Sequence, residues 1–142
     1  MEENKILAQY DIGNFYKINM AIRKNDLDAC KKILDNSQNK NPMDHKKTTA
    51  LHRAAVSNCV DIFEMIIDMV MNRNPWNEDG ETPLHLAAEK GHSTIVNMIL
   101  DKTNDNINSK FDNYTPLELA ELFDHEEIQN LISESLKHQG LA

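Results

Sequence analysis

The chain has 142 residues, of which 40% are hydrophobic, so it can form one domain with a core of its own. Its formal charge of −8 argues against nucleic acid or an anionic membrane as partner, because both need clustered Lys and Arg. The sequence has neither a basic, apolar leader nor an apolar run of about 18 residues. We therefore expect a single domain, residues 1–142, that is a monomer in the cytoplasm, with the nucleus as a further location.

The cysteines are Cys30 and Cys59, and neither belongs to a CxxC motif. Without a His pair at metal-ligand spacing, they indicate free thiols in a reducing compartment. The sequence also lacks a Ser/His/Asp or Cys/His constellation and a phosphate-binding loop. We expect no catalytic residue, no metal and no cofactor, and hence a protein that is not an enzyme.

One pattern recurs along the chain with a spacing of 33 residues. It reads YKINMAI at 16–22, TALHRAA at 49–55, TPLHLAA at 82–88 and TPLELAE at 115–121. The first copy keeps the apolar positions Ile18 and Ala21 but loses the Thr, Pro and His. A fixed period of this length predicts a repeat architecture.

Each later copy predicts the start of a short helix. Its Thr is a good N-cap, and Pro83 and Pro116 fit the first helical position, where a backbone N–H would be unpaired anyway. After this helix the chain should turn at a residue that tolerates positive φ. The residues at that position are Asn25, Asn58, Gly91 and Asp124.

A second helix should follow each turn. The expected ranges are about 26–36, 59–70, 93–101 and 126–137, with apolar residues at helical spacing such as Ile62, Met65, Ile66 and Met69. We interpret Met20, Met65, Met69 and Met98 as core fillers rather than as an adaptable binding face. The acids within 124–127 are interpreted as charges that favour a helix start rather than as a metal site.

Residues 15–138 resemble ankyrin repeats, on the segments TALHRAAVSN, TPLHLAAEKGH and YTPLELAELFDH. The resemblance implies an all-α solenoid of helix–loop–helix units with projecting hairpin-like loops. The repeats would be about 15–43, 44–76, 77–109 and 110–138, with the first and last as caps. It also implies that His52 and His85 bond backbone and link adjacent loops. His92 and His125 receive the same structural interpretation.

The sequence departs from the family pattern at two kinds of position. Lys47 and Asn113 stand where Gly80 occupies the loop turn. A Lys at positive φ costs about 1 kcal/mol or more, which predicts a distorted first loop. Ser37, Val70 and Thr103 stand where the family has a Gly after the second helix, so these helices should end differently.

Partners of ankyrin-repeat proteins usually meet the loop tips and the concave face of the first helices. Carried over to this sequence, the predicted protein-binding residues are Met43, His45, Lys46, Trp76, Glu78, Asp79, Glu81, Glu89, Lys90, Phe111, Asp112 and Tyr114. Exposed aromatic residues mark protein interfaces, and Trp76 is the strongest candidate. The alternative is that Phe111 or Tyr114 folds back onto its own loop and that Leu122 and Phe123 lie under the C-terminal tail.

The resemblance therefore implies a non-catalytic adaptor or inhibitor that binds one protein partner through the concave groove and loop tips. The partner could be a transcription factor, a kinase or a cytoskeletal protein. Because the predicted surface carries several acids, the contact patch of the partner should carry Lys or Arg. The alternative function is a targeting or regulatory fragment of a larger enzyme or channel.

Overall fold

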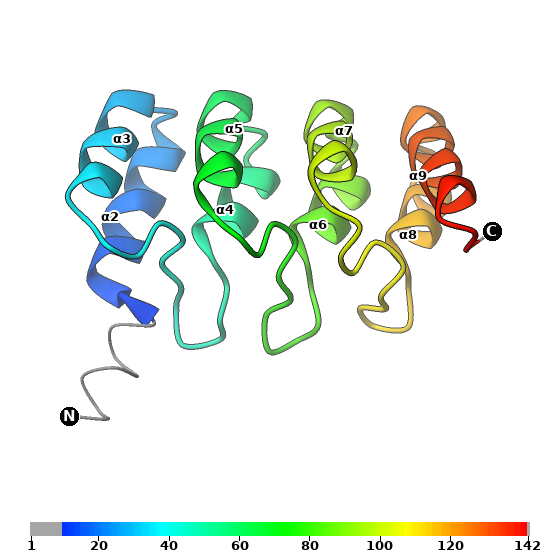
Figure 1. Ribbon diagram of the computed structural model, residues 1–142, viewed down its shortest axis with the longest axis horizontal. Coiled ribbons are helices and arrows are strands. Elements are labelled where there is room, and N and C mark those ends of the chain that lie inside the picture. The colour runs from blue at the N-terminus through cyan, green and yellow to red at the C-terminus, as the bar shows by residue number, and fades with distance from the viewer. Residues whose placement is uncertain (1–9, 142) are drawn as a thin grey trace. The chain divides into compact units, whose positions relative to one another are not determined.

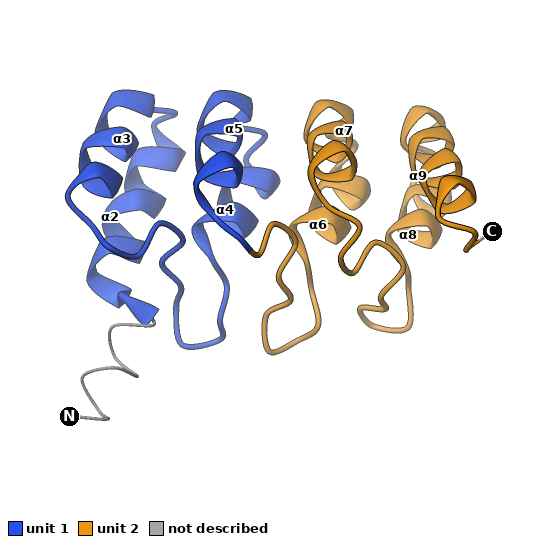
Figure 2. Ribbon diagram, viewed as in Figure 1, with its two compact units in different colours: residues 1–71 blue, residues 72–142 orange. Residues whose placement is uncertain are grey.

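The computed structural model describes residues 10–141 (Figure 1). The acidic start of the chain, residues 1–9, lies outside the described residues. The chain forms two compact units, Met1–Met71 and Asn72–Ala142 (Figure 2). The helices of the first unit are α2 (Ile12–Arg23), α3 (Leu27–Asp35), α4 (Ala50–Val56) and α5 (Val60–Met69). Those of the second unit are α6 (Pro83–Lys90), α7 (Ser93–Lys102), α8 (Pro116–Leu122) and α9 (Glu126–His138).

Both units are built from two helix pairs. In the first unit α2 contacts α3 and α4, α4 contacts α5, and α3 contacts α5. In the second unit α6 contacts α7 and α8, α8 contacts α9, and α7 contacts α9. Within each unit, the two first helices thus lie side by side and so do the two second helices, with a loop that extends beyond the helices between the two pairs (Figure 1). The predicted all-α fold of helix–loop–helix units is confirmed.

The first helices of the last three pairs begin at the predicted threonines. The side chains of Thr49, Thr82 and Thr115 each accept a hydrogen bond from the backbone N–H three residues on. Pro83 and Pro116 occupy the start of α6 and α8, where the missing N–H costs nothing. The second helices also lie within about one residue of the predicted ranges.

The turn between the two helices of each pair needs a left-handed residue. The φ angles are 51° at Asn25, 54° at Asn58, 80° at Gly91 and 60° at Asp124, as predicted. Gly91 has a further constraint, because a Cβ at this position would lie 2.8 Å from the ring of His125. The turn of the third pair therefore has room for glycine alone unless that ring moves.

The core contradicts the interpretation of the methionines. In α5 the buried residues are Ile62, Phe63, Ile66 and Ile67, so the helix buries two adjacent rows rather than the predicted stripe. Met20 is 59% exposed and Met69 is 39% exposed, whereas Met65 and Met98 are half-buried. The prediction that all four fill the core is wrong, since helical spacing gives the period of the buried face but not its centre.

The first loop is not distorted. The carboxylate of Asp44 accepts from the N–H groups of Lys46 and Thr48 at 2.9 and 3.0 Å, and the Lys47 N–H donates to the Asp44 carbonyl at 3.0 Å. In the next loop Asn77 makes the equivalent three bonds to Asp79, Glu81 and Gly80 at 3.0–3.1 Å. The side-chain oxygen at the start of each loop fixes the same turn. Lys47 therefore adopts φ 61°, close to the left-handed conformation of Gly80.

The third loop uses a different turn. Phe111 and Tyr114 exchange both backbone hydrogen bonds, at 2.8 and 2.9 Å. Asp112 and Asn113 between them have φ 51° and 68°, the combination of a type I′ hairpin. The loop has Lys110 where Asp44 and Asn77 supply the acceptor oxygen, which explains the change.

The second helices α3, α5 and α7 end without a left-handed cap, as the missing glycines predict, whereas α9 is followed by Gly140 at φ 71°. Val70, after α5, has φ −114° and ψ 152°, and Thr103, after α7, has φ −153° and ψ 154°. The chain therefore leaves both helices in an extended conformation. Ser37 lies one residue beyond the C-cap of α3, which is Asn36.

We expect Lys47→Gly to raise the free energy of unfolding by about 0.5–1 kcal/mol, because glycine adopts the left-handed conformation without the Cβ penalty. Urea denaturation measures the change. Lys46→Gly is the matched control, since Lys46 has no positive φ and gains no relief there. A lower denaturation midpoint for Lys47→Gly than for the wild type would contradict the interpretation that the positive φ of Lys47 costs stability.

Candidate protein-binding surface

A buried Thr–His pair joins the start of α6 to the following loop. The His85 N–H donates to the Thr82 hydroxyl oxygen at 3.1 Å, and the Thr82 N–H donates to Nδ1 of His85 at 3.2 Å. On the other side of the ring, Nε2 lies 2.9 Å from the Ser109 carbonyl oxygen. His85 is 1% exposed, so it links the helix to the chain before the third loop inside the protein.

These contacts define the protonation state of the ring. Because Nδ1 accepts from a backbone N–H, the proton lies on Nε2, which donates to the Ser109 carbonyl. A second proton, on Nδ1, would point at the Thr82 N–H and would remove the acceptor of that hydrogen bond. Burial lowers the pKa of His85, and backbone hydrogen bonds with Ser109 and Tyr114 oppose this effect. The ring therefore acts as a neutral structural bridge.

The other copies show which part of this arrangement is general. Thr49 and His52 form the same capping box, with a 3.1 Å bond from the Thr49 N–H to Nδ1. At the start of α8, the Glu118 carboxylate accepts from the Thr115 N–H at 3.2 Å. A carboxylate closes the box but has no proton to donate to a carbonyl. His85 therefore differs from Glu118 in that its ring also bonds a carbonyl elsewhere in the chain.

His125 makes a second bridge within the same unit. Its Nε2 lies 3.0 Å from the carbonyl oxygen of Glu89, at the end of α6, and its ring lies against Gly91. Glu126 and Glu127 occupy the first turn of α9, where the helix dipole favours carboxylates. The structural interpretation of these residues is confirmed.

The two cysteines are free, buried thiols, as predicted. Burial raises the pKa of Cys30 to about 11, with the charges of Asp26 and Cys59 adding to the effect. Burial also raises the pKa of Cys59, whose Sγ lies 3.4 Å from the Ile22 carbonyl oxygen. Because the thiolate is the reactive form, both groups are poor nucleophiles at neutral pH.

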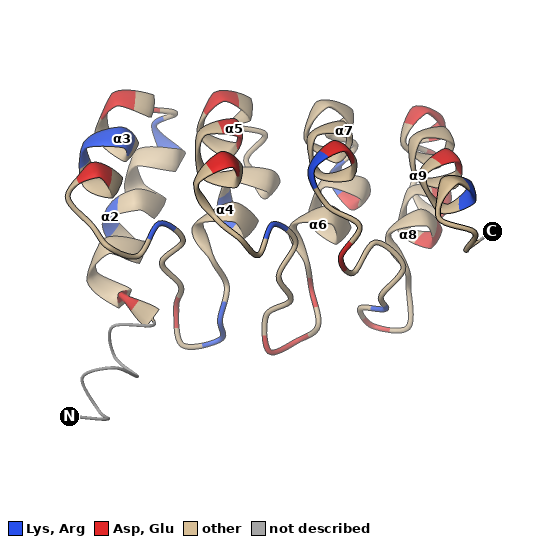
Figure 3. Ribbon diagram, in the orientation of Figure 1, with Lys and Arg blue, Asp and Glu red and all other residues tan. Residues whose placement is uncertain are grey.

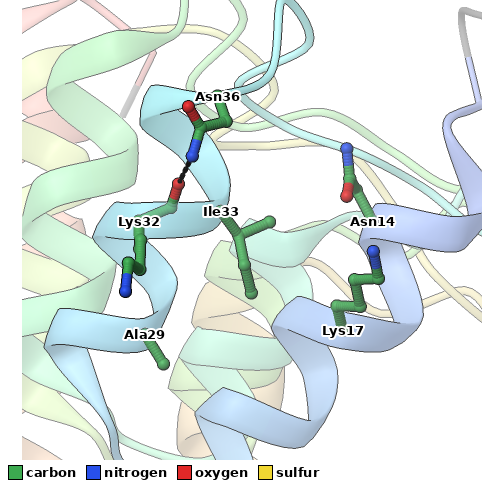
Figure 4. A pocket seen from close by; sticks show the side chains of 6 residues that line it. All are labelled: Asn14, Lys17, Ala29, Lys32, Ile33 and Asn36. Carbon is green, nitrogen blue, oxygen red and sulfur yellow. Dashed lines mark hydrogen bonds between the residues drawn. The ribbon is translucent and has the colours of Figure 1, made fainter.

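The hollow beside α2 and α3 offers little chemistry (Figure 4). Its volume is about 350 Å³, and the side chains that line it are Asn14, Lys17, Ala29, Lys32, Ile33 and Asn36. Lys17 comes from α2 and Lys32 from α3, and Asn36 donates to the Lys32 carbonyl at 3.0 Å. The lining has no carboxylate, imidazole or thiol for acid–base or nucleophilic work. Elsewhere in residues 10–141, no group of three or more His, Cys, Asp and Glu could hold a metal ion.

The predicted binding residues of the first loop differ in accessibility. His45 and Lys46 are exposed at the loop tip. Met43 is half-buried, pairs with Thr49 in an isolated β-bridge and donates its N–H to the Tyr10 carbonyl at 2.7 Å. The first loop thus presents its tip, while Met43 is held at its base.

The second loop presents Trp76 with 59% of its side chain exposed. Glu78 and Asp79 are exposed at the tip, and Glu81 is half-buried, accepting from the Asn77 side-chain amide at 3.2 Å. Figure 3 shows the resulting acidic loop. This is the one loop among the described residues in which an exposed Trp lies beside carboxylates.

The aromatic residues of the third loop have different environments. Phe111 is half-buried, and its ring packs edge-on against His85 with centroids 5.9 Å apart. It therefore packs onto the preceding repeat rather than onto its own loop. Tyr114 remains 39% exposed, and Asp112 is exposed.

The ends of the first helices add further exposed groups in the second unit. Lys90 is exposed at the end of α6, and Glu89 is half-buried. Leu122 is 57% exposed and Phe123 is 47% exposed at the end of α8, so the described part of the tail does not cover them.

Two asparagines that sequence reasoning did not select hold the second loop in place. Asn74 is fully buried: its Oδ1 accepts from the Leu84 N–H at 3.1 Å, and its Nδ2 donates to the Asp105 carbonyl at 3.0 Å. Asn77 is 4% exposed and organises the turn. The match of Asn74-Pro75 to Asn41-Pro42 at the repeat spacing was the available signal, and Asn41 does accept from the Leu51 N–H at 3.1 Å.

Comparison with known proteins gives the family. A family model described as ankyrin repeats (3 copies) matches residues 18–111 and 71–139. The comparison with curated proteins returned no match. Across the described chain, the helices are too short or too polar to cross a membrane.

We expect His85→Ala to lower the free energy of unfolding by about 1–3 kcal/mol, because it leaves the Ser109 carbonyl and the Thr82 N–H without their partner. Glu118→Ala removes the equivalent capping group at an exposed position and should cost less, below about 1 kcal/mol. Chemical denaturation of both variants compares them. Equal losses would show that the link to Ser109 contributes nothing.

The lowered pKa of His85 predicts a pH dependence. Below the ordinary pKa of histidine the unfolded chain binds a proton that the folded ring does not, so this contribution to stability is present at neutral pH and is lost on acidification. His85→Gln serves as reference, because it removes this group and leaves the others. The stability difference between wild type and variant should shrink as the pH falls from about 7 to about 5. A constant difference would contradict the neutral ring.

Proposed function

Because the chain belongs to the ankyrin-repeat family, whose repeats are protein–protein interaction modules, we propose that it is a non-catalytic adaptor or inhibitor of one protein partner. It would act in the cytoplasm and bind through the loop tips and the exposed ends of the first helices. The observation that carries the proposal is the exposed Trp76 in the second loop. A partner surface with Lys and Arg would complement the acids beside it.

The fold leaves the side chain of Trp76 largely exposed. Its neighbours Pro75 and Asn77 are buried, whereas the indole itself is mostly exposed. Met43 and Ser109 occupy the same position in the other loops, so the repeat does not require an aromatic there. A large exposed aromatic without a packing role is typical of a binding anchor.

The loop holds Trp76 in a fixed place. Asn74 is bonded to Leu84 and Asp105, and its carbonyl accepts from the Asn106 side-chain amide at 2.9 Å. Asn77 bonds the two N–H groups on the far side of the tip. The backbone on both sides of Trp76 is therefore anchored before any partner arrives. A rigid anchor loses little conformational entropy on binding, which favours affinity.

The acids of the second loop indicate the charge of the partner. Glu78 and Asp79 are exposed, and no basic residue lies between Asn74 and Thr82. A partner with Lys or Arg at the contact would associate faster at low ionic strength. Tyr114, Leu122 and Phe123 supply further exposed apolar area in the same unit, as an interface core requires.

We expect Trp76→Ala to weaken binding of the partner by about 2 kcal/mol or more with little change in stability. The partner would be captured from source cells by the full chain, and its affinity would then be measured with purified components. Met71→Ala is the matched control, because Met71 is 98% exposed and lies just after α5, before the hydrogen-bonded residues Asn74 and Asn77 of the second loop. Equal affinity of wild type, Trp76→Ala and Met71→Ala would overturn the assignment of this surface.

A charge variant tests the same surface independently. Asp79→Lys should weaken binding most at low salt, and the loss should diminish as salt screens the charges. Thermal melts of both variants report whether the fold is intact.

A further inference from the structure

The second helices of the first unit border a groove on another surface. The groove lies between α3 and α5 and has a volume of about 480 Å³. It contains none of the loop residues discussed above. Both walls are helices, so the groove presents side chains rather than an open strand edge.

The apolar part of the groove lining is partly open to solvent. It is formed by Leu27, which is 37% exposed, Met69, which is 39% exposed, and the half-buried Met65. Met65 and Met69 lie one helical turn apart on α5, and Leu27 lines the same groove from the start of α3. Met65 and Met69 are two of the methionines that the core leaves out. Flexible, polarisable Met side chains suit a surface that packs against another helix.

The polar part of the groove lining is acidic. Asp28 from α3 and Asp61, Glu64 and Asp68 from α5 line it, with Lys31 as the single basic residue. Among residues 10–141, the carboxylates of Asp28, Asp61 and Glu64 have neither a hydrogen bond nor an ion pair. Figure 3 shows the acidic positions on α5.

Helix stability does not account for all of these acids. Asp28 and Asp61 lie in first turns, where the helix dipole favours a carboxylate. Asp68 lies in the last turn of α5, where the dipole disfavours it, and that turn has no basic residue. The acids also do not converge on a cation site, since no group in the described chain could hold a metal ion. An apolar lining beside Asp28, Asp61 and Glu64 instead suits an occupant with apolar and basic faces.

We infer that the α3/α5 groove binds a basic amphipathic α-helix of a partner protein. Leu, Met or Phe on one face of that helix would pack against Leu27, Met65 and Met69. Lys or Arg on its flanks would pair with Asp61 and Glu64. A helix fits better than an extended peptide because its backbone hydrogen bonds are satisfied internally and the groove offers no strand edge. The surface lies in the first unit and is separate from the Trp76 loop.

A synthetic peptide tests the groove directly. The probe is a fluorescein-labelled, end-blocked peptide of about 18 residues, long enough for a stable helix, with Leu on one face and Lys or Arg beside it. A scrambled peptide of the same composition separates amphipathic recognition from simple charge attraction. Anisotropy titration with the full chain should show binding of the first peptide at concentrations below about 100 µM and much weaker binding of the second.

Matched variants locate the site. Asp61→Lys/Glu64→Lys should weaken binding about tenfold or more, whereas Asp101→Lys/Glu134→Lys, which makes the same charge change on exposed positions of α7 and α9, should change it less than about twofold. Met69→Gln should weaken binding by about threefold or more, while Met71→Gln, at a more exposed Met outside the groove, should not.

Each other result overturns the inference. Absence of binding to the wild type, equal binding of the scrambled peptide, or equal losses in the groove variants and their controls would do so. Trp76→Ala should leave the peptide affinity unchanged. Failure of the groove and failure of the proposed Trp76 surface are therefore distinguishable.

Discussion

The buried Thr–His pair is the interaction on which the positions of the other parts depend. Thr82 and His85 hydrogen-bond to each other at the start of α6, and the His85 ring also hydrogen-bonds to the carbonyl oxygen of Ser109. Inside a protein these groups cannot exchange one partner for water, so losing one bond leaves a polar group unpaired. The described chain has no buried side-chain polar atom without a partner. Helix start and loop base are thereby fixed together.

With the frame fixed by buried groups, the exposed residues can differ between repeats without disturbing it. Trp76, Met43 and Ser109 share one register position, and the turn of the first two loops forms with either Asp44 or Asn77 as acceptor. The methionines of the α3/α5 groove likewise lie outside the core. The two proposed surfaces come from different elements, a loop and a pair of second helices. The Trp76 loop and the α3/α5 groove would in this way bind two different parts of a partner.

The sequence predicted the helix starts, the left-handed turns and the second helices because each depends on neighbouring residues. Thr82 needs only the N–H of His85, and Asn58 needs only its own tolerance of positive φ. The environment of Phe111 could not be predicted, since its partner His85 is distant in sequence. The prediction that Met20 and Met69 are buried was wrong because the buried face of a helix depends on which neighbours pack against it. The binding residues remain a prediction, since exposure alone does not identify a partner.

The placement of one proton gives the arrangement a direction. Nδ1 of His85 is occupied by the Thr82 N–H that precedes it, so only Nε2–H is left, and it donates to Ser109 further along the chain. The ring thus accepts a hydrogen bond from an earlier residue through Nδ1 and donates one to a later residue through Nε2. These two roles cannot be exchanged in this arrangement. At the equivalent position of α8, the Glu118 carboxylate accepts from the Thr115 N–H, but a carboxylate has no hydrogen with which to bond a carbonyl further along the chain. The link from the start of α6 to Ser109 therefore depends on the tautomer of His85.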